Sequence, residues 1–596
     1  MVVHSRIKSS AYFDSVALML VQREVRALPG VREAGAVMGT EANKELLRDA
    51  GLLAPEAAGA GPDDLILSVD AADASTADAA LAEAEALLTQ RRAGPEVEGY
   101  RPKTVASAAR VLSGARLALI SVPGRFAAGV ASEALDAGLH VMLFSDNVPL
   151  EAEVALKRRA AAAGRLLMGP DCGTAILGGA ALGFANRVRR GAAGIVGAAG
   201  TGIQEVTSLI HRGGGGISHA IGTGGRDLSS EVGGAAAMAG LAALAADPLT
   251  EVIVLLSKPP SAGVASRLLR AARRSGKPVV VHFIGAAVES GERLFSAQTL
   301  EETAELAVQL VTGSPPRWPR RAALPGQEAM RLAPTQRYVR GLYSGGTLCY
   351  EALLLLERYV GPVHSNTPLD PAQMLPSAHR SVAHTVVDLG SDEFTVGRLH
   401  PMLDPSTRLH RLLREADDPE VAVILLDVVL GYGAHANPAG VLAPVIREAR
   451  GRAHAAGRWL SVVASVCGTE DDPQGYDDQV DQLIEAGALV QSSNAQAANL
   501  AGLIAQAAGA SGRARVPSPI TAGREAERPA DAEASGTPPV QEIVRLLAGP
   551  VKVVNVGLGL FAEALQSQGI DVVSVDWQPP AGGKQHLIDI LNRLGA

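Results

Sequence analysis

The sequence predicts an α/β protein of several domains, in which mainly parallel sheets are covered by helices. Three observations carry this prediction. Short apolar strand patterns alternate with amphipathic helix patterns along most of the chain. Glycine-rich turns follow several of these strands, and 65 residues are glycine. The length of 596 residues exceeds what one hydrophobic core holds, so about three to five domains are expected.

Residues 1–97 have the pattern of a small α+β domain. Helical patterns at 15–28 and 41–51 alternate with strand patterns at 33–38 and 64–70, and a last helix runs to Leu88. This order predicts a ferredoxin-like or ACT-like domain.

Residues 98–187 predict a Rossmann-like domain. Strand patterns at 117–122, 140–145 and 165–169 are separated by two helical patterns. Strands and helices that alternate at this spacing favour a parallel, doubly wound sheet, whose ligands bind at the carboxyl ends of the strands.

Residues 188–315 and 336–510 repeat one plan and predict two flavodoxin-like domains. Three positions match at an offset of 146 residues; they are Gly200, Thr201 and Glu205 in the first copy and Gly346, Thr347 and Glu351 in the second. Such a repeat indicates a duplicated unit. Residues 316–335 and 511–539 are rich in Pro, Ala and charge and predict linkers, the second of them flexible. Residues 540–596 predict a small separate α/β unit.

Charge and composition exclude several classes of protein. The net charge of −8 and the pI of about 6.0 give no basic field for nucleic acid. The chain begins without a signal-peptide pattern and has no apolar run long enough for a membrane helix, so we expect a cytoplasmic protein with no membrane partner. Cys172, Cys349 and Cys467 are far apart, and no metal site is predicted.

Glycine-rich loops at strand ends are the main candidates for ligand binding. A loop that runs from a strand into a helix directs free backbone N–H groups and the positive end of the helix dipole at an anion. An ordinary tight turn with a threonine cap is the alternative for each loop. The predicted phosphate- or substrate-binding residues are Gly200, Thr201 and Gly202; Gly222, Thr223, Gly224 and Gly225; and Ser344, Gly345, Gly346 and Thr347.

Charged side chains beside these loops are candidates for catalysis. Arg226 follows the second loop and is predicted to grip a phosphate or carboxylate, unless it pairs with Asp227 or another acid. Lys258 and His435 follow equivalent strands of the two copies, so Lys258 is predicted to neutralise phosphate and His435 to donate to the leaving oxygen, with Asn437 nearby. An exposed lysine and a turn histidine are the alternatives.

Several segments together resemble known families. The succession GRLLMGPDCGTAIL, GIVGAAGTGIQE and GTGGRDLS is similar to the α subunit of succinyl-CoA synthetase, and SGGTLCYEA resembles the paired ligase domains of that group. With YFDSVALML, GYGAHANPAG and NVGLGLFAEALQSQGIDVVSVDWQPPAGG, the whole chain resembles the FdrA family.

The resemblance implies a CoA-binding-type domain at 98–187 and ligase-type domains at 188–315 and 336–510. It implies that Asp171, Cys172 and Gly173 form a ligand-contacting loop. It also implies a subunit of a hetero-oligomeric oxamate carbamoyltransferase, which interconverts N-carbamoyl-oxamate and phosphate with carbamoyl phosphate and oxamate.

The chain departs from the synthetase pattern at two places. The segment after the strand at 278–284 contains no histidine to carry phosphate, and the CoA-cradling glycine turn is not evident at the start of the Rossmann-like domain. We therefore predict direct chemistry on an acyl phosphate without a phosphohistidine, with a carboxylate such as oxamate as acceptor. No cofactor is assigned, and CoA belongs to the alternative of an acyl-CoA synthetase. A non-catalytic assembly or regulatory subunit is a further alternative.

Overall fold

The computed structural model describes residues 2–9, 15–61, 64–93, 102–316, 318, 324–395, 399–509 and 540–580. The linker expected at 511–539 lies outside these residues, as do part of the linker at 316–335 and the last sixteen residues. No helix within the described ranges is both long and apolar enough to span a bilayer.

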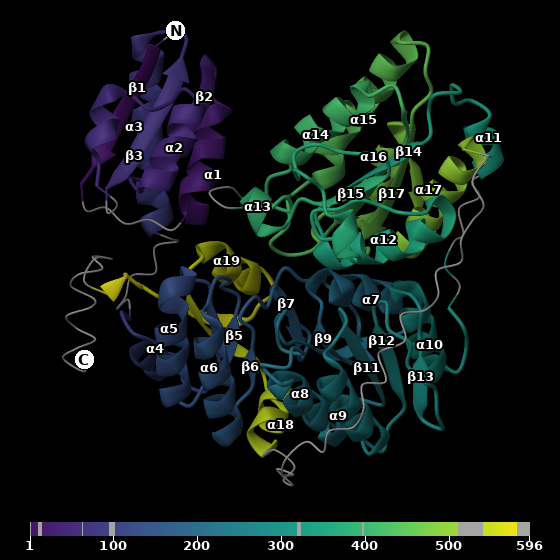
Figure 1. Cartoon of the computed structure of the whole chain (residues 1–596). Coiled ribbons are helices and arrows are strands. Elements are labelled where there is room, and N and C mark those ends of the chain that lie inside the picture. The colour runs from purple at the N-terminus through teal and green to yellow at the C-terminus, as the bar shows by residue number, and fades with distance from the viewer. Residues whose placement is uncertain are drawn as a thin grey trace.

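The N-terminal domain is a three-stranded antiparallel sheet with helices on both faces (Figure 1). Its strand order is β1-β3-β2, and every residue of the central strand is buried. Leu65, Leu67 and Val69 of that strand pack on one face against α1 and α3, while Ile66 packs on the other face with Leu47 of α2. The expected small α+β domain is confirmed. Its elements are β1 (Val2–Lys8), α1 (Ser15–Arg26), β2 (Val31–Met38), α2 (Glu41–Asp49), η1 (Pro55–Gly59), β3 (Leu65–Ala71) and α3 (Ala74–Ala93).

The Rossmann-type domain is assembled from two distant parts of the chain. Its parallel sheet has the order β20-β19-β4-β5-β6, so the C-terminal segment adds two strands beside β4 and is not a separate unit. Val553, Val554 and Val556 of β19 are fully buried, and pairing with β4 gives this apolar strand a second neighbour. The elements are α4 (Val105–Val111), β4 (Leu117–Ile120), α5 (Gly124–Asp136), β5 (His140–Leu143), α6 (Leu150–Ala162), β6 (Leu167–Met168), α18 (Gln541–Ala548), β19 (Lys552–Val556), α19 (Gly559–Ser567) and β20 (Asp571–Val575).

The first unit, residues 174–312, is a seven-stranded sheet of order β13-β12-β11-β9-β10-β7-β8. Strands β9 to β13 are parallel, and the hairpin β7–β8 extends the edge beside β10. Its elements are β7 (Thr174–Leu177), β8 (Ala180–Gly183), β9 (Arg190–Ala198), α7 (Gly200–Arg212), β10 (Ile217–Gly222), α8 (Ala235–Ala246), β11 (Val252–Ser257), α9 (Ala262–Arg273), β12 (Val279–Phe283), β13 (Leu294–Ser296) and α10 (Leu300–Thr312).

The second unit, residues 338–508, has a parallel sheet of order β15-β14-β16-β17-β18. Its elements are β14 (Tyr338–Tyr343), α12 (Gly346–Val360), η2 (Pro371–Gln373), β15 (Thr385–Asp388), α13 (Asp392–Thr395), α14 (Ser406–Asp417), β16 (Val421–Val429), α15 (Pro438–Ala455), β17 (Ser461–Cys467), α16 (Tyr476–Glu485), β18 (Leu489–Gln491) and α17 (Asn494–Ala508); α11 (Pro325–Ala329) precedes it.

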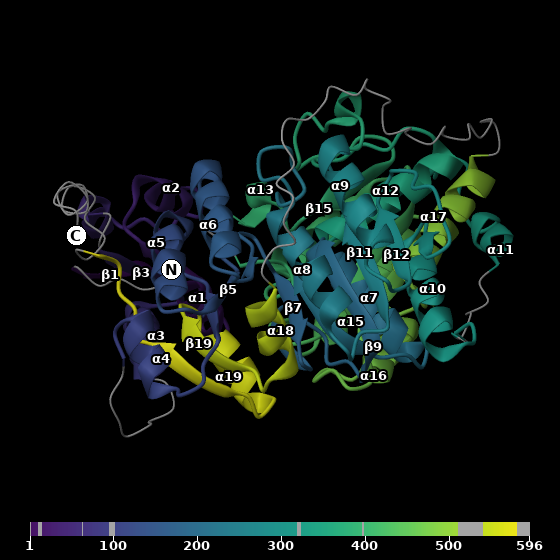
Figure 2. The same cartoon turned by 90° about the horizontal axis from the view of Figure 1, so that it is seen from below.

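The two units share one topology, which confirms the predicted pair of flavodoxin-like domains. Numbered along the chain, the five parallel strands of each unit have the spatial order 2-1-3-4-5. The first helix of each unit, α7 or α12, follows the first strand, and Thr201 and Thr347 are the second residues of these helices. In Figure 2 the two units lie against each other, and the first unit also packs against the Rossmann-type domain, where α8 contacts α6 and α18.

The matched glutamates join the two units by reciprocal contacts. The Glu205 carboxylate of the first unit accepts from the backbone N–H of Asn494 (3.0 Å), at the start of the last helix of the second unit. The Glu351 carboxylate of the second unit accepts from the N–H of Leu300 (2.7 Å), at the start of the last helix of the first unit. Each glutamate thus satisfies a helix N-terminus across the interface, and this fixes α7 relative to α12.

Candidate functional site

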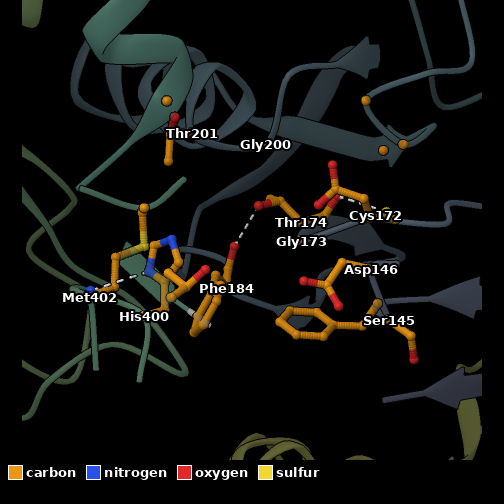
Figure 3. Close-up of a pocket in the computed structure, with 18 of the residues that line it drawn as sticks. Ser145, Asp146, Cys172, Gly173, Thr174, Phe184, Gly200, Thr201, His400 and Met402 are labelled. Carbon is orange, nitrogen blue, oxygen red and sulfur yellow. Dashed lines mark hydrogen bonds between the residues drawn. The ribbon is translucent and has the colours of Figure 1, made fainter. Parts of the chain in front are cut away.

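The carboxyl ends of strands from three sheets meet around one cavity of about 670 Å³. The Rossmann-type domain contributes the segments after β4, β5, β6 and β19. The first unit contributes the segments after β9, β10 and β11, and the second unit those after β14 and β15. Figure 3 shows this cavity, with Thr201 on one side and Asp146 and Ser145 on another. Because parallel strands of α/β sheets bind ligands at this end, the cavity is the candidate site.

The two glycine-rich helix starts of the flavodoxin-like units meet at the cavity. The backbone N–H of Thr347 donates to the hydroxyl of Thr201 (3.2 Å). A side chain at Gly202 would lie 2.8 Å from Thr347 Cγ2, and one at Gly345 would lie 2.9 Å from Thr201 Cγ2. The first N–H groups of α7 and α12 have no acceptor within their own helices. Two positive helix ends therefore converge on one point, which favours an anion there.

Lys258 and two carboxyls with raised pKa values lie beside these helix starts. Burial raises the pKa of Asp171 to about 6 and that of Asp388 to about 6, while the charge of Lys258 opposes both shifts. All three residues line the cavity. The Asp388 carboxylate accepts from the N–H of Gly390 (2.9 Å), and Asp171 has a backbone φ of 56°. The site thus combines a fixed cation with two acids that titrate just below neutral pH.

The loop of residues 222–225 carries a polar atom that protein contacts leave unsatisfied. Thr223 lines the cavity, and its hydroxyl oxygen is buried without a hydrogen-bond partner among the described residues. A side chain at Gly224 would lie 2.2 Å from the Pro170 carbonyl oxygen, so only glycine fits this approach to the Asp171 loop. Buried hydroxyls are normally satisfied, so the Thr223 hydroxyl is an exception beside the cavity.

A buried ion cluster behind the cavity holds this loop in place. The Lys157 ammonium donates to the Thr223 carbonyl (2.9 Å) and to Asp227 Oδ1 (2.6 Å), and it lies 3.2 Å from Glu153 Oε1. Asp227 in turn accepts from the N–H groups of Ala236 and Ala237 at the start of α8. The cluster therefore ties the loop to α6 and α8.

His400 is a site residue that the sequence did not single out. It lies on the cavity wall beside Phe184 and Met402, as Figure 3 shows. Burial lowers its pKa to about 4, so the ring is neutral at pH 7. The Met402 N–H donates to Nδ1 (3.3 Å), which leaves the ring proton on Nε2. His400 is thus a neutral donor, a role that the segment 399–404 alone does not reveal.

Two of the predicted catalytic residues, and Asn437, do not line the cavity. Arg226 pairs with Glu153 (2.9 Å) and donates to the Val148 carbonyl (2.7 Å), because the loop turns its guanidinium toward α6. Asn437 caps α15 by accepting from the Gly440 N–H (2.9 Å). The ring of His435 accepts from the Asn437 N–H (3.1 Å), and burial followed by the charge of Arg23 lowers the pKa of this histidine. The structure thus favours the alternatives of an ion pair and a turn.

The other predicted residues gather at the site. Gly202 and Gly345 pack the two helix starts together, and the remaining predicted residues line the cavity; these are Asp171, Cys172, Gly173, Gly200, Thr201, Gly222, Thr223, Gly224, Gly225, Lys258, Ser344, Gly346 and Thr347. Burial raises the pKa of the Cys172 thiol to about 12, which makes it a poor nucleophile. The described residues contain no cluster of His, Cys, Asp and Glu suited to a metal ion.

A glycine-rich turn after β19 also borders the cavity and was missed as a site. Gly557, Gly559 and Ala562 match the G-x-G-x-x-A spacing of nucleotide-binding turns, and Leu558 and Phe561 line the cavity. Gly557 has a φ of 118°, and a side chain there would lie 2.6 Å from Ser121 Oγ on β4's end. Such a turn was expected only at the start of residues 98–187, where none is evident, whereas this turn lies near the C-terminus and reaches the domain through β19.

We expect anion affinity at this site to rise as the pH falls through about 6. Protonation of Asp171 and Asp388 removes two negative charges beside the bound anion, which is worth about tenfold in affinity. Sulfate is a suitable probe because its charge is constant between pH 5 and 8; calorimetry would give the profile. The Asp171→Asn/Asp388→Asn variant should bind tightly and independently of pH. An unchanged or falling wild-type affinity toward pH 5 would contradict the assignment.

We expect Arg226→Ala to change sulfate affinity little. The guanidinium is half exposed and pairs with Glu153 outside the cavity, so the loss should stay below about 1 kcal/mol. Calorimetric titration beside Lys258→Met, which should lose most of the affinity, provides the scale. If Arg226→Ala lost as much sulfate affinity as Lys258→Met, Arg226 would have to contact the anion.

Comparison with known proteins agrees with this architecture. The model of the AllF heavy metal-associated domain matches residues 1–102, that of a CoA binding domain matches 189–285, and that of CoA-ligase matches 342–504. The CoA-binding match falls on the first unit, where the sequence predicted a ligase-type domain. Residues 1–102 contain no cysteine and one histidine, His4, so they lack the cysteine thiolates that favour heavy metals.

Solved structures with similar folds are remote. The apo dinucleotide-forming acetyl-coenzyme A synthetase 1 of Ca. Korarchaeum cryptofilum is 17% identical with a TM-score of 0.28, over 68% of this chain and 86% of that one. The Methanosaeta concilii ATP citrate lyase with (3S)-citryl-CoA is 16% identical with a TM-score of 0.31, over 37% of this chain and 44% of that one.

A closely related sequence is YahF of Escherichia coli (strain K12), whose function is uncharacterized. It is 44% identical over 505 residues, which cover 83% of this chain and 97% of YahF. The chain therefore belongs to the YahF family, with an AllF-type N-terminal domain followed by CoA-binding- and CoA-ligase-type domains.

Proposed function

We propose that the chain is an FdrA-type subunit of a carbamoyltransferase, which exchanges a carbamoyl group between phosphate and oxamate. The observation that carries the proposal is that two helix N-termini meet beside Lys258 at the cavity. This arrangement suits a phosphate that is bound and not transferred to the protein.

In the proposed reaction the bound phosphate attacks the carbamoyl carbon of N-carbamoyl-oxamate. The N–H groups at the starts of α7 and α12 and the ammonium of Lys258 hold the phosphate, and the His400 Nε2–H donates to the carbamoyl oxygen. The bond from that carbon to the oxamate nitrogen breaks. Asp171 or Asp388 protonates the nitrogen and recovers a proton from the phosphate hydroxyl. The products are carbamoyl phosphate and oxamate, without a phosphohistidine.

Histidine chemistry supports this choice of a direct transfer. His282, after which the synthetase pattern carries its relay histidine, is buried in β12 and bonds to the Ala297 carbonyl (3.0 Å). His400, on the wall of the cavity, comes from the second unit and is held neutral by burial. Because its low pKa keeps His400 neutral, its ring can donate a hydrogen bond that polarises a carbonyl.

An acyl-CoA synthetase is the second candidate, because the turn after β19 fits a CoA cradle. Gly557 approaches β4 closely, Gly559 is the first residue of α19, and no atom lies within 4 Å of a side chain placed at Gly559. The backbone N–H groups of Gly557 and Gly559 would hold the pyrophosphate of CoA, while the Leu558 N–H donates to the Ser121 hydroxyl (2.8 Å). CoA would supply the thiol acceptor for the acyl group. The family matches to CoA-binding and CoA-ligase domains support this candidate.

Two assays separate the candidates. The purified chain, with and without the proteins encoded beside it, is tested for phosphate-dependent release of oxamate from N-carbamoyl-oxamate. The same samples are titrated with CoA. Oxamate release with CoA affinity weaker than micromolar supports the carbamoyltransferase, and the reverse pattern supports the synthetase. Oxamate release only in the presence of other subunits would fit the expected hetero-oligomer. Neither activity in any combination would favour the non-catalytic subunit.

A further inference from the structure

A second cavity, of about 770 Å³, lies between the N-terminal domain and the second unit. One wall is a face of α1 that carries Gln22, Arg23 and Arg26 at helical spacing. The opposite wall is a face of α14 with Thr407, Arg411 and Arg414. Positions three and four apart lie on one side of a helix, so each helix presents two arginines to the same space.

The positive charge of these walls is only partly matched by acids. Arg411 pairs with the buried Glu415, and Arg26 lies 3.4 Å from Glu33. Arg23 and Arg414 instead donate to backbone carbonyls, those of Leu403 (3.4 Å) and His379. The other carboxylate on the wall, Asp404, accepts from the N–H of Ser406 (3.0 Å). Four arginines thus stand against three carboxylates, of which only Glu33 and Asp404 line the cavity.

The arginines of α1 and α14 repel each other across the cavity. An anion between them would attract both walls. The floor is apolar, with Leu47, Leu52, Leu389 and Phe394. We propose that this cavity binds a small organic anion with at least two negative charges, which bridges α1 and α14. Its apolar body would lie on the floor, and its charges would meet Arg23 and Arg414, with His410 beside them.

The bridging site is distinct from the first cavity but shares a wall with it. Leu389 and Phe394 line the second cavity, and Asp388, Gly390 and His400 line the first. Leu399 lines both cavities. Both sets belong to the segment between β15 and α14. An anion that contacts Leu389 and Leu399 therefore acts on the wall of the first cavity, and the proposal stands whether or not carbamoyl transfer is the reaction.

The test is hydrogen exchange of the full chain with pyrophosphate or succinate at constant ionic strength. At least one of the two anions should slow exchange in α1 and α14. Protection by pyrophosphate indicates a phosphorylated ligand, and protection by succinate indicates a dicarboxylic one. In Arg23→Gln/Arg414→Gln the apparent affinity should fall by about tenfold or more. Arg158→Gln/Arg273→Gln removes the same charge from exposed positions that line neither cavity and should behave as wild type.

The site would be overturned if neither anion protected α1 and α14 from exchange. It would also be overturned if Arg23→Gln/Arg414→Gln were protected as strongly as the wild type, or if the control variant lost as much affinity as Arg23→Gln/Arg414→Gln. Both substituted arginines are exposed, so the variant should fold.

Discussion

Replacing Gly345 by valine should reduce sulfate or phosphate affinity at the first cavity by about a hundredfold. The new Cβ would lie 2.9 Å from Thr201 Cγ2 and 3.0 Å from Thr201 Cβ, so the starts of α7 and α12 must separate. Separation breaks the bond from the Thr347 N–H to the Thr201 hydroxyl and withdraws one set of N–H donors from the anion. A charge-assisted hydrogen bond contributes about 1.5 to 3 kcal/mol, which sets the expected size.

The matched control is Gly129→Val, because no atom lies within 4 Å of a side chain at that glycine of α5. Calorimetric titration and circular dichroism on both variants separate a lost site from a lost fold. Gly202→Val tests the mirror contact with Thr347 and should give a similar loss. Full affinity in both Gly345→Val and Gly202→Val would show that the anion does not bind between the two helix starts.

Replacing Lys157 by methionine should destabilise the protein by about 3 to 5 kcal/mol. The Lys157 side chain is 2% exposed, and its removal leaves the fully buried Asp227 without a cation, while Glu153 keeps only Arg226. An uncompensated buried charge has a cost of this size. Urea unfolding followed by circular dichroism would measure it through the midpoint of the first transition, since a chain of several domains need not unfold in one step.

Arg159→Met is the control, two residues further along α6. Arg159 pairs with Asp136 at the surface, where both side chains are largely exposed, so the expected loss is about 0 to 1 kcal/mol. Anion affinity should also fall in Lys157→Met, because the lysine holds the Thr223 carbonyl. An unfolding midpoint of Lys157→Met equal to that of Arg159→Met would show that the buried cluster contributes no net stability.

Local sequence patterns predicted many residues of the candidate site. Glycine and threonine after an apolar strand mark a helix start that binds anions, so Gly200, Thr201, Gly346 and Thr347 were found from the sequence. Side chains whose role depends on direction were not predictable in this way. Arg226 follows the right loop but turns to Glu153, and His400 reaches the cavity from a segment without a strand or glycine signal.

The sequence by itself determined the fold class, the duplication and the loops that end in helices, because periodicity and glycine placement are local properties of the chain. Only the tertiary structure decided that β19 pairs with β4 and that its glycine turn faces the same cavity as Thr201. It also decided that burial shifts the pKa values of Asp171, Asp388 and His400, and that α1 and α14 face each other with arginines. Strand pairing and desolvation join residues hundreds of positions apart, and no local pattern encodes those distances.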